Sequence, residues 1–253
     1  MESDIRRLES HVREGLVAFI GDSPETVLAI HALQSGLGRV WTSGPSDDLR
    51  AVIVESALVP GEPQGFGDPA SLLDLLARAE GWRCIELNPD VADDITDDFE
   101  RRWGIASRVI DVVHISRQCP RVEGHPRVRP LRVPDLSRLS VASDDVFPGR
   151  RVVEGAAARG RVFVAIDGDS IVGHGSSFAA SGTYADIGVY VAASHRGQGI
   201  ATSAAALACE AVRADGLTPV WGTGSDNQGS LGVAAKLGFL EVARLVFLVP
   251  VGR

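Results

Sequence analysis

The residues whose types and spacing point most clearly to chemistry lie in the run IGVYVAASHRGQGIA, from Ile187 to Ala201. Its first half places apolar residues at every second position, as a β-strand with one buried face does. Its second half contains Arg196-Gly197-Gln198-Gly199, and a helix is predicted to follow, from about Gly199 to Asp215. The run therefore predicts a strand, a basic glycine-containing loop and the first turn of a helix.

A helix start attracts anions, because its first backbone N–H groups are unpaired and lie at the positive end of the helix dipole. Glycines just before the helix let a phosphate approach that backbone closely. The loop is therefore either a pyrophosphate-binding loop or an ordinary tight turn between a strand and a helix.

Two common phosphate-binding loops do not fit. A P-loop would end in Gly-Lys followed by Ser or Thr, and the sequence has no such ending. A dinucleotide-binding fingerprint would need glycine or alanine where Thr202 stands, and an acidic residue ending a second strand about 20 residues later.

A second stretch downstream narrows the choice. Asn227-Gln228-Gly229-Ser230 opens a predicted helix that ends in Ala235-Lys236-Leu237-Gly238-Phe239. Together the two motifs, Arg-x-x-Gly-x-Ala and Asn-x-x-Ser-x-x-x-Ala-x-Lys-Leu-Gly-Phe, resemble the GNAT family of acyl-CoA-dependent N-acetyltransferases over residues 127–250. The resemblance implies acetyl-CoA as the cosubstrate and implies no metal.

The resemblance also implies which residues bind the cofactor. Backbone N–H groups of residues 196–202 would face the pyrophosphate, and Arg196 would add a charge or stay a solvated turn residue. The strand before the loop would offer free backbone groups of two valines to the pantetheine amides, with the tyrosine between them facing the core or the acceptor wall. The asparagine and serine that head the later helix would contact the cofactor arm or only cap their helix. The implied set is Val189, Tyr190, Val191, Arg196, Gly197, Gln198, Gly199, Ile200, Ala201, Thr202, Asn227 and Ser230.

The proton acceptor is less well defined. Asp186 lies five residues before Val191 and is the candidate general base, with a structural or surface acid as the alternative. A base must lie within hydrogen-bond reach of the amine, and burial must raise the pKa of its carboxyl. His174 is the second candidate, and Ser176 and Ser177 are weaker ones.

Two other positions are Ala234, where a catalytic acid is expected in the family, and His195, next to the glycine loop. Many family members carry a tyrosine five residues before the Gly-Phe phenylalanine, where it can protonate the leaving thiolate, and this chain has Ala234 there. His195 is expected to be an exposed turn residue.

Composition limits the partners and the compartment. With 253 residues and a net charge of −8, the chain is no general nucleic-acid binder, and its acidity favours a cationic acceptor such as an amine. Cys84, Cys119 and Cys209 have neither metal nor disulfide spacing, which suits a reducing cytosol. Neither a signal peptide nor an apolar run of membrane-spanning length is found, so we expect a cytoplasmic protein without a membrane partner. Lys236 is the only lysine among 25 basic residues.

Two domains are expected, over residues 1–120 and 125–253, because residues 119–130 are rich in proline, glycine and arginine. The first is a mixed α/β lobe without a glycine loop, and it resembles the degenerate lobe of two-lobed GNAT proteins, which helps to wall the acceptor site. The second has the order β-α-α-β-β-β-α-β-α-β of a GNAT domain. The fold class is therefore α/β, mixed α+β, with a GNAT acyl-CoA-binding fold built on a central mixed sheet.

Hydrophobic periodicity and capping residues place the expected elements. In the first domain, helices are expected in 1–21 and over 23–35, 70–80 and 89–103, strands over 39–42, 50–55, 82–87 and 108–116, and a loop over 60–69. In the second, Asp135 is expected to cap a first helix, residues 143–150 to form a loop, and strands to cover 161–166, 170–178, 184–191, 218–223 and 239–249.

These features predict an acetyl-CoA-dependent N-acetyltransferase that acts on a primary amine of a small molecule, by direct attack in a ternary complex. The alternatives are a protein N-terminal or lysine acetyltransferase, and a coenzyme-binding module without catalysis. A homodimer is left open.

Overall fold

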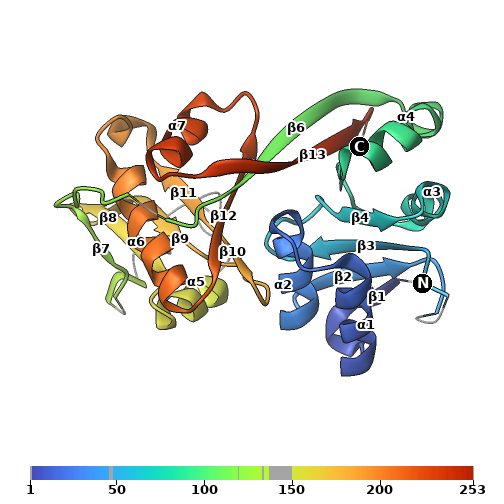
Figure 1. Cartoon of the computed structure of the whole chain (residues 1–253), viewed down its shortest axis with the longest axis horizontal. Coiled ribbons are helices and arrows are strands. Elements are labelled where there is room, and N and C mark those ends of the chain that lie inside the picture. Colours follow the sequence, from blue (N-terminus) through green and yellow to red (C-terminus); the bar gives the residue numbers. More distant parts are fainter. Residues whose placement is uncertain (1, 46–47, 119, 133, 137–149, 253) are drawn as a thin grey trace. The chain divides into compact units, whose positions relative to one another are not determined.

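The computed structural model describes residues 2–45, 48–118, 120–132, 134–136 and 150–252. The chain divides into two units, Met1–Val113 with Ala243–Arg253, and His114–Val242 (Figure 1). The expected ranges 1–120 and 125–253 put the last residues with the second domain, whereas contacts put residues 243–253 with the first. The reason is the last strand, β13 (Leu240–Pro250), whose later residues pair with β5 of the first unit, as Val246 does with Leu87.

The first unit is a mixed sheet with helices. Its strands run in the order β1-β2-β3-β4-β5-β13; β4 pairs in parallel with β5, and the other neighbouring strands pair antiparallel. The elements are β1 (Glu2–Asp4), α1 (Ser10–Ile20), α2 (Val27–Ser35), β2 (Gly38–Thr42), β3 (Ala51–Ser56), β4 (Gln64–Gly67), α3 (Pro69–Arg78), β5 (Ile85–Leu87) and α4 (Pro89–Trp103). Strand β6 (Ile105–Ile115) starts in this unit and ends in the second.

Most elements expected in this unit are confirmed, and two expectations are wrong. The stretch Pro60 to Pro69 is not only loop, because it contains β4. Gly65 packs closely in this strand: a Cβ there would lie 2.8 Å from Leu87 Cδ2, so the leucine side chain would have to shift. At the start of the chain, residues expected to be helical form β1 instead, paired with β2.

The second unit contains β7 (Val128–Pro130), α5 (Arg150–Ala158), β8 (Val162–Asp167), β9 (Ser170–Ser176), β10 (Tyr184–Asp186), β11 (Gly188–Val191), α6 (Ile200–Ala214), β12 (Thr218–Gly224) and α7 (Gln228–Lys236). Four strands form an antiparallel sheet in the order β11-β9-β8-β7, and β10 pairs in parallel with β12.

The four-stranded sheet is covered by helices on both faces. On β8, Phe163 belongs to the same buried cluster as α6, while Val162 and Val164 pack with α5, as the alternation of a strand requires. Helix α6 lies very close to β9: a Cβ on Gly175 would come within 2.4 Å of the Ala204 carbonyl carbon. Helix α6 therefore packs directly on β9 of this sheet (Figure 1).

The first residues of the second unit are only partly covered by the structure. Asp135 is buried, accepts a hydrogen bond from the Arg132 backbone N–H at 2.8 Å, and forms a two-bond ion pair with Arg129 at 2.6 and 2.7 Å. The helix that it was expected to cap, most of the 143–150 loop and Cys119 lie outside the described residues. Among the helices that the structure describes, none combines the length and the apolar character needed to cross a membrane.

Candidate functional site

The predicted strand Tyr184–Val191 is divided in the structure. Its first part, β10, pairs with β12, and the last bond of this pairing runs from Ile187 N–H to the Val220 carbonyl at 2.8 Å. Its second part, β11, leaves β12 and pairs with β9, Val189 lying opposite Gly175. The structure differs from the expected single strand only by the break at Ile187, and the free backbone edge expected at Val189 and Val191 is present because β11 leaves β12. The division opens a gap beside β11, on the side away from β9.

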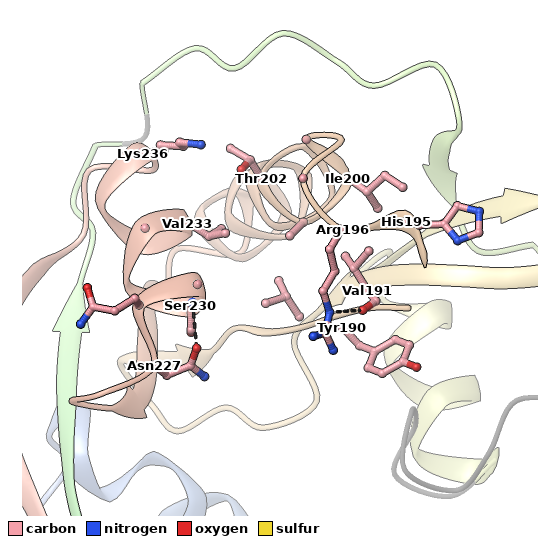
Figure 2. A pocket seen from close by; sticks show the side chains of 17 residues that line it. Tyr190, Val191, His195, Arg196, Ile200, Thr202, Asn227, Ser230, Val233 and Lys236 are labelled. Atoms are coloured by element: carbon pink, nitrogen blue, oxygen red, sulfur yellow. Dashed lines mark hydrogen bonds between the residues drawn. The ribbon is translucent and has the colours of Figure 1, made fainter. Parts of the chain in front are cut away.

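Backbone groups of β11 point into that gap. Ala192 N–H bonds the Val172 carbonyl of β9 at 2.9 Å. Because backbone groups alternate in an antiparallel pair, Val189 and Val191 turn their N–H and C=O groups away from β9. The Val191 carbonyl accepts a hydrogen bond from Arg196 Nε at 3.1 Å, so the arginine side chain lies along the strand edge (Figure 2).

The start of α6 has the geometry of an anion site. Gly197 and Gly199 have left-handed backbone, with φ of 77° and 83°, and a Cβ at either position would meet nothing within 4 Å. Glycine is thus favoured there by backbone conformation and not by lack of room. Gly199 is the N-cap and, among the described residues, no side chain caps the helix. The N–H groups of the first turn are therefore available to a ligand.

Strand edge and helix start open into one cavity of about 680 Å³. It is lined by Val189, Tyr190, Val191, His195, Arg196, Gly197, Gly199, Ile200, Ala201, Thr202, Asn227, Gln228, Gly229, Ser230, Gly232, Val233 and Lys236 (Figure 2). The lining includes an arginine, a lysine and a histidine, and no Asp or Glu is among these described residues. In a protein with a net charge of −8, such a cavity favours an anionic ligand.

The structure brings the predicted cofactor residues together: all of them except Gln198 line this cavity. Six lining residues were not in the predicted set: His195 in the loop, and Gln228, Gly229, Gly232, Val233 and Lys236 on α7. The missed signal on α7 is helical spacing, because Gly232, Val233 and Lys236 lie three, four and seven positions after Gly229 and so share one face of the helix.

His195 is not the exposed turn residue that we expected. Its side chain is 17% exposed, with Nε2 3.0 Å from Asp167 Oδ2 and Nδ1 2.9 Å from Ser194 Oγ. The bond with His195, helped by Arg127 at 3.5 Å, lowers the pKa of the Asp167 carboxyl. His195 thus ties the glycine loop to the turn between β8 and β9.

The two polar residues at the head of α7 have structural bonds. Asn227 Oδ1 accepts from the Ser230 backbone N–H at 3.1 Å, which confirms its capping role. Ser230 Oγ accepts from Trp221 Nε1 at 2.9 Å, which ties α7 to β12. Both residues still line the cavity, so the bonds hold them in place beside any ligand.

Asp186 ends β10, one residue before the strand divides. The side chain is partly buried, and burial raises the pKa of its carboxyl to about 6, against a smaller opposing effect of the Ile187 backbone N–H. Asp186 itself is not among the lining residues of the cavity.

The second candidate base lies in an aromatic cluster. His174 is buried, its ring stacks on Tyr190 with centroids 6.2 Å apart, and its Nδ1 lies 3.2 Å from Ser176 Oγ. Tyr190 packs in the cluster beside α5, as the expected core role requires, and it also borders the cavity.

The position of the usual family tyrosine is closed to solvent. Ala234 lies on the buried face of α7, is 1% exposed and packs in the same core cluster as residues of α6; its methyl side chain offers no proton donor. Among the described residues, no three His, Cys, Asp or Glu side chains gather in a group that could hold a metal ion.

Comparison with known proteins gives one family and several solved structures of similar fold. Residues 133–239 match the model of the acetyltransferase (GNAT) family. No curated protein matches the chain.

Solved structures resemble nearly the whole chain. A GCN5-related N-acetyltransferase-like protein from Streptococcus suis is 19% identical, with a TM-score of 0.68, over 95% of this chain and 99% of that one. A GCN5-related N-acetyltransferase from Kribbella flavida is 18% identical, with a TM-score of 0.66, over 92% and 97%.

A tandem GNAT protein from the clavulanic acid biosynthesis pathway is 12% identical, with a TM-score of 0.56, over 97% of this chain and 96% of that one. At these identities the likeness establishes the fold and not the substrate. The fold is thus that of GNAT acetyltransferases, including a tandem one, with a first α/β lobe preceding the matched domain. Residues 133–239 of this chain form a domain of the acetyltransferase (GNAT) family.

Proposed function

We propose that this protein transfers an acetyl group from acetyl-CoA to the primary amine of a small molecule, by direct attack in a ternary complex. One observation carries the proposal: the open edge of β11 and the uncapped start of α6 face the same positively charged cavity. A thioester with an amide-containing arm and a pyrophosphate needs both features side by side.

The described residues suit each part of acetyl-CoA. The N–H groups of residues 199–202 and the Arg196 guanidinium suit a pyrophosphate, and the outward-facing backbone of Val189 suits the amides of the arm. When bound, acetyl-CoA supplies the thioester carbonyl that the amine attacks, with the thiolate as the leaving group. Holding the two reactants in line can lower the barrier by about 7–11 kcal/mol.

Asp186 is the proposed general base. Its raised pKa, about 6, lets the carboxylate accept a proton near neutral pH, directly or through a water molecule. Asp186→Asn is expected to lower kcat by about 100-fold or more. The wild-type rate is expected to rise with pH through about 6, and the variant to lose that step.

The assay measures thiol release with a panel of primary amines that includes short peptides, so that a protein acceptor would also be detected. Asp169→Asn is the matched control, because Asp169 is exposed in the turn between β8 and β9. Unchanged turnover and an unchanged pH profile in Asp186→Asn would remove Asp186 from this role.

The same carboxyl makes a prediction about stability. A raised pKa means that the folded state binds the proton more tightly than the unfolded chain does, so stability falls as pH rises from about 4 to about 6. The free energy of unfolding of the wild type, taken relative to that of Asp186→Asn, is expected to be about 2 kcal/mol lower at pH 8 than at pH 4. Thermal melts of both proteins at the two pH values measure this. A difference in stability between the two proteins that does not change with pH would show that burial does not raise the pKa of this carboxyl.

A second candidate function has one observation in its favour. Ala234 leaves the usual place of the thiolate's proton donor without a hydroxyl, which suits a module that binds coenzyme A without catalysis. Tight binding of acetyl-CoA with no turnover on any amine or peptide would favour this second function over the first.

A further inference from the structure

His195 borders the cavity from the glycine loop and is also held by a second segment of the chain. Its Nε2 lies 3.0 Å from Asp167 Oδ2, at the turn between β8 and β9, and its Nδ1 lies 2.9 Å from Ser194 Oγ. Figure 2 shows the ring at the edge of the cavity, beyond Ile200. The ring is therefore fixed beside the cavity, and because it is still partly exposed it can exchange a proton with solvent.

Both hydrogen bonds of the ring survive a change of its charge. A carboxylate only accepts hydrogen bonds, so Nε2 carries the N–H in the neutral ring. Nδ1 of the neutral ring accepts from the Ser194 hydroxyl, and Nδ1 of the charged ring donates to the same oxygen. Because a hydroxyl can do either, His195 can gain a positive charge without losing Asp167 or Ser194.

Charged groups of both signs lie around the ring. Asp167 bonds it directly, and Asp169 is exposed in the same turn. Arg127, just before β7, lies 3.5 Å from the same Asp167 oxygen, and Arg196 follows His195 in the chain. The hydrogen bond with His195 and the charge of Arg127 lower the pKa of the Asp167 carboxyl, so this group stays charged over the pH range in which histidine titrates. With two carboxylates and two guanidinium groups nearby, one further anionic group can decide the charge of the ring.

We propose that His195 takes up a proton when coenzyme A binds, so that the affinity of the protein for coenzyme A rises as pH falls. The inference rests on the proposed function, which places the pyrophosphate at residues 196–202, directly after His195. A negative group there favours the charged ring, and by reciprocity the charged ring favours the ligand. Histidine carries its charge at the lower end of the range between pH 5 and 8, which gives the effect its sign.

Titration calorimetry with coenzyme A, in buffers of different ionisation heat, measures both the Kd and the protons taken up. The wild type is compared with His195→Gln, whose amide N–H can still bond Asp167 but does not titrate. The phosphate monoester of coenzyme A and the Asp186 carboxyl also titrate near pH 6, but they do so in both proteins. The Kd of His195→Gln divided by that of the wild type is expected to rise about fivefold from about pH 8 to about pH 5.5. A coupling of that size corresponds to at most about 0.4 additional protons taken up by the wild type.

Two further variants support the comparison. His11→Gln is the matched control, because it removes an exposed histidine of α1, outside the cavity lining, and it is expected to keep the wild-type proton uptake. Asp167→Asn removes the carboxylate that favours the charged ring, so a smaller pH dependence of the Kd is expected between about pH 8 and about pH 5.5.

Equal proton uptake in the wild type and His195→Gln at every pH would overturn the inference. So would a loss of affinity in His195→Gln by the same factor at both ends of the pH range, which would leave His195 as a structural tie of the loop. If the wild type binds no coenzyme A at any pH, the proposed function fails and the inference with it. Thermal melts check that each variant is folded.

Discussion

Gly199→Glu is expected to weaken coenzyme A binding by about 100-fold or more. The new carboxylate would stand at the N-cap of α6, where the proposed pyrophosphate lies, and would repel it. The φ of 83° adds strain, because a side chain in left-handed backbone costs about 1–2 kcal/mol. Titration calorimetry with coenzyme A measures the change in Kd.

Two control variants separate charge from strain. Gly199→Ala has the strain without the charge, and a Cβ there meets nothing within 4 Å, so a loss below about tenfold is expected. Gly216→Glu has both strain and charge, at a φ of 79° and with equal room, but lies after the end of α6 and away from the cavity lining. If Gly199→Glu binds as well as Gly216→Glu does, the pyrophosphate does not lie at the start of α6.

Gly175→Ala is expected to destabilise the second unit by about 3 kcal/mol, the upper part of the range for overpacked cores. A Cβ at Gly175 would lie 2.4 Å from the Ala204 carbonyl carbon and 2.5 Å from Ala205 N, so the backbone of α6 would have to move away from β9. A fall in Tm of about 10 °C is expected in a thermal melt. Coenzyme A binding should weaken as well, because the same helix supplies the N–H groups of the loop.

Gly222→Ala is the matched control for this strand substitution. Gly222 lies in β12, where a Cβ meets nothing within 4 Å, so an unchanged or slightly raised Tm is expected. Equal melting of Gly175→Ala and the wild type would show that α6 does not pack on β9 as closely as described.

The cofactor-binding loop could be predicted because its chemistry is local. The helix start after the glycine loop was expected from neighbouring residues, and the structure confirms it as α6; the left-handed backbone of Gly197 and Gly199 is a further finding that suits glycine there. The same holds for the head of α7, where the Asn227 cap is formed as its residue type predicts. Capping and glycine conformation depend on a few neighbouring residues, so they can be predicted from the sequence.

Features that depend on distant partners could not be predicted in the same way. The division of β10 from β11 is set by β9 and β12, whose paths the run from Tyr184 to Val191 does not encode. The partial burial of His195 depends on Asp167, 28 residues earlier in the chain. The raised pKa of Asp186 likewise comes from packing around it, which alternation along one strand does not reveal.

Hydrogen–deuterium exchange with and without acetyl-CoA tests most directly whether the strand edge and the helix start hold one ligand. The account predicts slower exchange in peptides that cover residues 188–202 and 227–236, both of which line the cavity, and no change in peptides within residues 2–103. Binding of acetyl-CoA that leaves exchange in residues 188–202 unaltered would contradict it.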